Sequence, residues 1–221
     1  LRLHTMDQYV DKFVITEANY MHSGEPKKLL FDINKFPKFK DKIVYIPVIE
    51  QPEDILKNND NDSEDLKLSK MTDNAKKREM YQINKTSKGF KDADLEDIII
   101  VSDLDEIPNL ENINFKKINK KIIFFKKKMY YYKLNLLYKS FVWHGSKACK
   151  KKYLISPEIL RSSKNKKYPL WRIDTYFSKL KNRSVHVVDN GGWHFSNIKK
   201  PEELEKKMLN FLHYVDYKNS G

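Results

Sequence analysis

The strongest fold signal in the chain is the run Ile98-Ile99-Ile100-Val101, four consecutive β-branched residues. Such residues favour extended backbone, and a strand that is apolar on both faces is typical of a sheet covered on both sides. The run therefore predicts a central strand of a largely parallel sheet. A chain of 221 residues, 40% of them hydrophobic, is long enough to bury such a sheet in a single α/β domain.

Other elements follow from apolar spacing and from turn residues. Strands are predicted over residues 13–16, 43–48, 185–188 and 193–198, with two or three antiparallel strands within residues 116–152. Helices are predicted within residues 1–10, over 75–88 before Gly89, from Ser156-Pro157 towards Arg161, and from Pro201 onward. The last helix carries an apolar stripe of Leu204, Met208, Phe211, Leu212 and Val215.

Residues 50–74 differ in composition from the rest of the chain. They contain eight acids, three lysines and few apolar residues. Such a segment cannot bury enough apolar surface to pack. It is expected to be a mobile acidic insertion within the single domain.

The net charge of +13 favours anionic partners, but its composition weakens that argument. Of the 43 basic residues only five are arginine, and isoleucine and asparagine are abundant, as in proteins from AT-rich genomes. Part of the charge therefore reflects composition. The stretch 116–152, with 13 lysines among aromatic residues, leaves nucleic-acid binding open as a non-enzymatic alternative.

Cysteine content and hydropathy exclude several classes of protein. Cys149 is the single cysteine, so a disulfide scaffold and a cysteine-rich zinc site are excluded. No apolar run is long enough for a membrane span, and no leader opens the chain. We expect a reducing cytoplasm, of a microbe or a virus-infected host cell, or a membrane-associated secretory compartment if an anchor has been removed.

The main chemical signal is the pair Asp103 and Asp105, directly after the apolar strand. Ligands of open α/β sheets bind beyond the carboxyl ends of strands. Two neighbouring carboxylates repel each other unless a cation joins them. Mg²⁺ or Mn²⁺ typically takes one or two protein carboxylates together with substrate phosphate oxygens. The pair therefore predicts a metal that holds a diphosphate, against the alternative of an acidic turn.

Further candidate residues carry weaker signals. Gly191-Gly192 would let the backbone approach a ligand, and His194 beside them could complete a metal shell or contact a phosphate. In a lysine-rich chain, Arg78 and Arg161 are candidates for a diphosphate, which a planar guanidinium binds well. Glu17 could accept a hydrogen bond from a ribose or a base. Each of these residues could equally be structural.

Three blocks of sequence, in order along the chain, resemble glycosyltransferase family 17. The first is Phe13–Asn19 with Ser23–Lys27 and Leu30-Phe31, the second is Ser102–Pro108, and the third is Gly192–Ser196 with Pro201-Glu202 and Lys207. The resemblance spans nearly the whole chain. Animal members of this family are β-1,4-mannosyl-glycoprotein 4-β-N-acetylglucosaminyltransferases, which add the bisecting GlcNAc to N-glycans.

The resemblance implies a fold, a donor and a set of site residues. It implies a GT-A-like fold and inverting transfer from a UDP-sugar to a glycan or glycoprotein acceptor. UDP-GlcNAc is the first candidate for the donor. It implies Mn²⁺ or Mg²⁺ held by Asp103 and Asp105, with His194 on the metal or the diphosphate. Residues that would line the donor site are Glu17, Lys27, Arg78 and Arg161. The resemblance leads us to expect a further strand N-terminal to Leu1, and the acidic insertion is unlike the animal members.

An inverting displacement also needs a carboxylate base on the acceptor hydroxyl. Asp174, which follows Trp171-Arg172, is the first candidate, with Asp189, Glu158 and Glu106 as alternatives. Asp105 is included among the catalytic residues because its metal would stabilise the departing UDP. A second enzymatic alternative is a phosphatase of the haloacid dehalogenase type with Asp103 as nucleophile.

Overall fold

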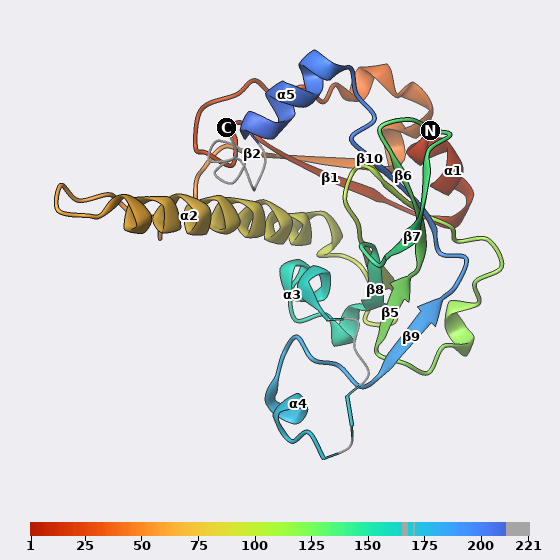
Figure 1. Cartoon of the computed structure of the whole chain (residues 1–221). Helices are drawn as coiled ribbons and strands as arrows, with labels where there is room; N and C mark the ends of the chain where they lie inside the picture. The colour runs from red at the N-terminus through yellow and green to blue at the C-terminus, as the bar shows by residue number, and fades with distance from the viewer. Residues whose placement is uncertain (165–167, 170, 211–221) are drawn as a thin grey trace. The chain divides into compact units, whose positions relative to one another are not determined.

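The computed structural model describes residues 1–164, 168–169 and 171–210, and these form two units. The first unit combines Leu1–Asp11 with Lys91–Ile198, and the second combines Lys12–Phe90 with the described residues from Lys199 onward. Both contain helices and strands, and the strands of the chain pair in parallel and in antiparallel fashion, so the α/β class is confirmed. Figure 1 shows the course of the chain through these elements.

The second unit is built on a parallel strand pair and one long helix. Strand β1 (Phe13–Ala18) pairs with β2 (Ile43–Val48), and the connection between them contains the 3₁₀ helices η2 (Ile33–Lys35) and η3 (Pro37–Lys42). Helix α2 (Glu64–Lys85) contacts both strands and continues into η4 (Thr86–Phe90). The core of the second unit includes Ala18, Tyr20 and Val48, and Tyr81 of α2 packs against them. Helix α5 (Pro201–Asn210) belongs to the same unit.

Helix α2 begins eleven residues earlier than the sequence pattern predicted, at Glu64 and not at Ala75. The Ser63 side chain accepts a hydrogen bond from the Leu66 N–H at 3.3 Å, and Glu64 and Asp65 lie in the first turn, where the helix dipole favours negative charge. Residues 64–74 are therefore helical. The second half of the acidic segment is thus part of a regular helix, and the mobility expected of the segment stays a prediction.

The first unit contains two four-stranded sheets. One has the order β3-β8-β5-β9, from β3 (Ile98–Val101), β8 (Lys147–Lys150), β5 (Ile122–Phe125) and β9 (Val185–Val188). The other has the order β4-β10-β6-β7, from β4 (Glu106–Pro108), β10 (Gly192–Ser196), β6 (Lys127–Tyr131) and β7 (Leu137–Trp143). Only β5–β9 and β10–β6 are parallel pairs within these sheets.

The prediction that β3 is the central strand of a largely parallel sheet is wrong. Strand β3 lies at the edge of its sheet and pairs antiparallel with β8 alone among the described strands. The interior positions belong to β8 and β5, and the four residues of β5, Ile122–Phe125, are all buried. The stretch 116–152 forms four strands, two of which also have parallel neighbours, and not two or three antiparallel ones.

Short helices complete the first unit. Helix α1 (Arg2–Met6) leads into η1 (Asp7–Tyr9), α3 (Pro157–Ser162) contacts β3 and β8, and α4 (Asp174–Phe177) follows. The 3₁₀ turn η5 (Phe115–Lys117) lies between β4 and β5, and η6 (Lys151–Tyr153) lies between β8 and α3. The prediction that Ser156 caps a helix with proline in its first turn is confirmed, since its side chain accepts from the Ile159 N–H at 3.1 Å.

The core of this unit surrounds the single cysteine. Cys149 is 2% exposed and packs with Ile122, Phe124 and Leu160. Burial raises the pKa of its thiol to about 12. No helix among the described residues is both long and apolar enough to cross a membrane. In α5, Leu204 and Met208 lie within the described part of the predicted stripe, whereas Phe211, Leu212 and Val215 lie outside the described residues.

Candidate active site

The two aspartates lie in the turn that joins β3 to β4. The N–H of Glu106 donates to the carbonyl oxygen of Asp103 at 3.2 Å, which closes the turn, and Leu104 projects into solvent with 87% exposure. Arg2 of α1 also donates to the Asp103 carbonyl oxygen. The turn is therefore held from both sides through its backbone, and its side chains remain able to contact other groups.

Asp103 is bound by Arg161. The guanidinium donates from Nε to Oδ1 at 2.9 Å and from Nη2 to Oδ2 at 2.6 Å, a two-bond geometry that fits a carboxylate closely. Arg161 comes from the last turn of α3. Lys147 donates to the carbonyl oxygens of Arg161 and Ser163, so it holds the end of that helix. Burial, and after it the neighbouring charge of Arg161, lower the pKa of Lys147 to about 8.

Asp105 lies next to His194 of β10. Its Oδ1 is 3.4 Å from the imidazole Nε2, and its backbone carbonyl oxygen accepts from the Phe195 N–H at 2.8 Å. The His194 side chain is 8% exposed and stacks on Trp143, with ring centroids 4.8 Å apart. Its Nδ1 is buried with no hydrogen-bond partner among the described residues. The structure thus brings Asp103, Asp105, Arg161 and His194 together in one unit, and their roles towards a metal and a diphosphate stay predictions.

Beneath the turn lies a buried ion pair that sequence reasoning missed. Glu106 and Lys127 are both 0% exposed and lie 3.1 Å apart. Ser146 donates to Glu106 at 2.7 Å, and the Trp143 indole donates to its other oxygen. Burial raises the pKa of Glu106, but the charge of Lys127 and these hydrogen bonds outweigh it and lower the pKa overall. Burial lowers the pKa of Lys127 to about 8 against the opposing effect of Glu106.

The glycine pair serves the fold. A Cβ on Gly191 would overlap the backbone of Phe125 and Lys126, and one on Gly192 would overlap the Ile107 carbonyl oxygen. Gly192 also has φ +114°, where side chains are strained. The close approach predicted for a ligand is therefore made by the chain's own backbone.

Three predicted donor-site residues belong to the second unit. Glu17 accepts from the N–H groups of Leu30 and Phe31 at 2.8 and 3.0 Å, and from Lys27 at 3.1 Å. Burial raises the pKa of Glu17, but these donors lower it overall. Lys27 and Glu17 are thus brought together as an ion pair.

Arg78 is 8% exposed in α2 and donates to the Gln51 side chain at 2.8 Å and to the His22 carbonyl oxygen at 2.9 Å. These bonds fasten the loops that follow β1 and β2 to the helix. Arg78 is therefore a buried donor in the second unit, and its role towards a diphosphate stays a prediction.

Asp174, the predicted base, is also paired. Arg172 donates to its two oxygens at 2.7 and 2.8 Å, and Lys181 lies 2.5 Å from Oδ2. These hydrogen bonds lower the pKa of Asp174, which makes it a weaker base. Among the alternatives, Glu106 is enclosed and Asp189 is 85% exposed with Lys126 at 3.1 Å. No group of three or more His, Cys, Asp or Glu side chains in the described part of the chain could hold a metal ion.

Three comparisons with known proteins were made, and one of them gave a match. A search of curated proteins and a search of solved structures gave no significant match. The family model of glycosyltransferase family 17 matches residues 1–220, which include both aspartates, Arg161 and His194. The match covers nearly the whole chain, and the chain therefore belongs to glycosyltransferase family 17 and is a glycosyltransferase.

Proposed function

We propose that the protein is a metal-dependent, inverting transferase that moves GlcNAc from UDP-GlcNAc to a hydroxyl group of a glycan. The family supports glycosyl transfer and a nucleotide-sugar donor. The observation that carries the rest is the contact between Asp105 and His194, a carboxylate oxygen and an imidazole nitrogen 3.4 Å apart at the β4–β10 junction.

These two groups fit a divalent cation. Oxygen and nitrogen ligands bind such ions at about 2.0–2.2 Å, so atoms 3.4 Å apart can share one ion. Magnesium-type sites commonly have one or two protein ligands and take the rest from water and substrate phosphates. Two protein ligands are therefore enough for a cation that also binds a diphosphate. The buried Nδ1 of His194 has no hydrogen-bond partner in the described structure, so the imidazole can make one further hydrogen bond.

Asp103 acts differently from Asp105 in this proposal. Both of its carboxylate oxygens are bound by Arg161, so Asp103 orients the guanidinium. Arg161 is 28% exposed and supplies fixed positive charge beside the Asp105 site. A fixed cation stabilises the charge that develops on a departing diphosphate without reorganising during the reaction.

The buried groups beneath the turn position the site. Trp143 stacks on His194 and donates to Glu106, while Glu106 is bound by Lys127 and Ser146. The imidazole plane is thereby fixed relative to the turn that carries Asp105. A bound Mn²⁺ or Mg²⁺ would supply Lewis-acid stabilisation of the leaving UDP.

The residues for the nucleotide and for the catalytic base are also proposals. Glu17, Lys27 and Arg78 are proposed for the nucleotide, in the second unit. Asp174 remains the proposed base, although acceptor binding would have to weaken its bonds to Arg172 and Lys181 before it could accept a proton. The family match supports neither a phosphatase nor a nucleic-acid-binding module.

A thermal-shift panel of nucleotide sugars tests the proposal. UDP-GlcNAc with Mn²⁺ should raise the Tm of the parent protein by about 5–10 °C at about 100 Kd, and GDP- and CMP-sugars should not. Asp105→Asn should abolish the Mn²⁺-dependent part of the shift and reduce transfer about a hundredfold. Asp41→Asn, an exposed aspartate of the second unit, is the matched control.

Arg161→Lys is the second arm, because it keeps the charge but loses the planar two-bond contact with Asp103. We expect about tenfold slower transfer and an unchanged Mn²⁺ requirement. Turnover by the parent that persists in excess EDTA, or Mn²⁺-dependent turnover by Asp105→Asn equal to the parent, would contradict the proposal.

A further inference from the structure

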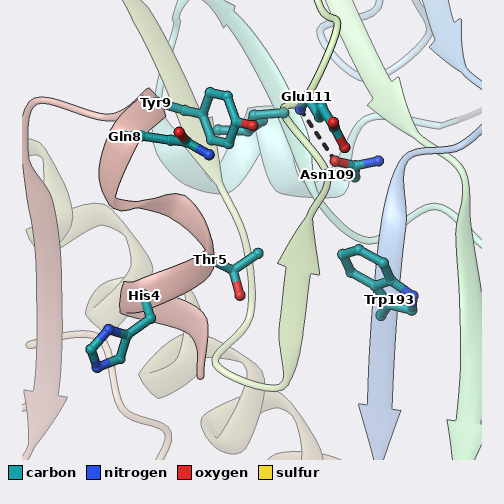
Figure 2. Close-up of a pocket in the computed structure, with 8 residues that line it drawn as sticks. His4, Thr5, Gln8, Tyr9, Asn109, Glu111 and Trp193 are labelled. Carbon is teal, nitrogen blue, oxygen red and sulfur yellow. Dashed lines mark hydrogen bonds between the residues drawn. The ribbon is translucent and has the colours of Figure 1, made fainter.

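A cavity of about 330 Å³ lies in the first unit, and none of the residues assigned above to the metal or the diphosphate lines it. One wall comes from α1 and η1, with His4, Thr5, Gln8 and Tyr9, and the other wall comes from Asn109, Glu111 and Trp193 (Figure 2). Leu110, which is 4% exposed, adds an apolar contact. The cavity is at the small end of the range for ligand pockets, about 300–1,000 Å³.

The strand register places this cavity on the other face of the sheet from His194. In the β10–β4 pair, His194 lies opposite Glu106 and Trp193 lies opposite Ile107. Directly paired residues share a face, and successive residues alternate between faces. Trp193 therefore faces away from the buried Glu106–Lys127 pair and into the cavity, while its neighbour His194 contacts Asp105.

The chemistry of the lining selects the kind of ligand. In this chain 43 of 221 residues are lysine or arginine, yet none of the described residues that line the cavity is either, and Glu111 is an acid. The cavity is therefore unsuited to phosphate, nucleotides or nucleic acid. What it offers is two aromatic side chains, Tyr9 with 41% exposure and the half-buried Trp193, among amide, hydroxyl, imidazole and carboxylate groups.

This combination suits a sugar. The apolar faces of pyranose rings pack on aromatic rings, and their hydroxyl groups need planar partners that both donate and accept. Asn109 accepts from the Glu111 N–H through Oδ1 at 3.2 Å, which fixes the amide and turns its NH₂ group to other acceptors. The α1 wall is itself anchored, because Arg2 donates to the Asp103 carbonyl oxygen.

We propose that this cavity is a binding subsite for a neutral oligosaccharide, on the acceptor side of the reaction. The inference deepens the proposed function and rests on it for the role of the sugar, but the binding itself does not depend on the metal site. Arg2 connects the two places, since the same short helix carries the cavity wall and a contact to the Asp103 turn.

Saturation-transfer NMR and calorimetry on the full chain test this subsite, with chitobiose and mannotriose as probes and inorganic phosphate as the anionic comparison. We expect both sugars to bind and phosphate not to compete. Tyr9→Ala and Glu111→Ala should each weaken sugar binding at least tenfold. Tyr153→Ala, at a tyrosine with the same 41% exposure outside this cavity, should not change it.

The arms separate this inference from the proposed function. Sugar binding that persists in Asp105→Asn, with transfer lost, supports the subsite independently of the metal site. Sugar binding that is unchanged in Tyr9→Ala and Glu111→Ala, or lost in Asp105→Asn, would overturn the subsite and leave the metal site in place. No binding of either sugar to the parent would overturn it as well. Far-ultraviolet circular dichroism confirms that each variant is folded.

Discussion

Glu106 and Lys127 form an ion pair that water does not reach, directly beneath the aspartate turn. Removing two charges from water costs several kcal/mol for each ion, and only close pairing with further hydrogen bonds offsets that cost. Here Ser146 and Trp143 supply those bonds to Glu106. The pair therefore fixes the position of the turn more than it adds to the net stability of the unit.

A double-mutant cycle measures this. Lys127→Met leaves an uncompensated buried carboxylate and should lower the free energy of unfolding by about 3–5 kcal/mol. Adding Glu106→Gln should restore much of that loss, because both charges are then gone. Urea denaturation of the parent, both single variants and the double variant gives the coupling, and additive losses would contradict a strong pairing.

The lowered pKa values of Glu106 and Lys127 predict that the free energy of unfolding depends on pH. The pKa of Glu106 is lowered in the folded state, so its contribution to stability is complete above the ordinary value of about 4.3 and is lost as pH falls through the folded value. The pKa of Lys127 is also lowered, to about 8, so its contribution rises with pH between about 8 and 10.4. The double variant should lose both dependences.

At the scale of elements, the aspartate turn is carried by an edge strand and fastened by its neighbours. Strand β3 pairs only with β8 among the described strands, while α3 brings Arg161 and β10 brings His194 to the turn. The site is thus assembled from three elements that are distant in sequence. Displacement of α3 would affect Arg161 and Asp103 together, because they are bonded to each other.

Helix α2 gives a prediction at this scale. Ser63→Ala removes the side chain that accepts from the Leu66 N–H and should lower the free energy of unfolding by about 1 kcal/mol. Ser69→Ala, in the exposed middle of the same helix, should instead raise it slightly, because alanine has the higher helix propensity. Equal effects of the two substitutions, measured by urea denaturation, would place the start of the helix elsewhere.

Sequence reasoning located the chemical groups better than it located the sheets. The spacing of Asp103 and Asp105 after an apolar run, and His194 after two glycines, identified residues that the structure brings together. Strand partners could not be predicted, because an apolar run such as Ile98–Val101 is equally compatible with an edge covered by a helix and with a sheet interior. The buried Lys127 was hidden because lysine is common throughout this chain.

At the scale of the whole molecule, the lysine excess has a testable consequence of its own. Lysines that contact phosphates without reading bases give binding that falls steeply with salt. We expect any retention of the protein on duplex DNA to disappear by about 200 mM salt and to be unchanged in Asp105→Asn. Tight binding at higher salt, measured by fluorescence anisotropy, would contradict this expectation and indicate nucleic-acid contacts beyond charge attraction.

The single thiol of Cys149 lies in the core of the first unit, next to Ile122 and Leu160, and its pKa is about 12. A thiol of this kind stays protonated and shielded from reagents for as long as its sheet is closed. Alkylation of the native protein therefore requires local opening of the core around Cys149. Because Cys149 is the single cysteine of the chain, its rate of alkylation would report local opening of the first unit without any added label.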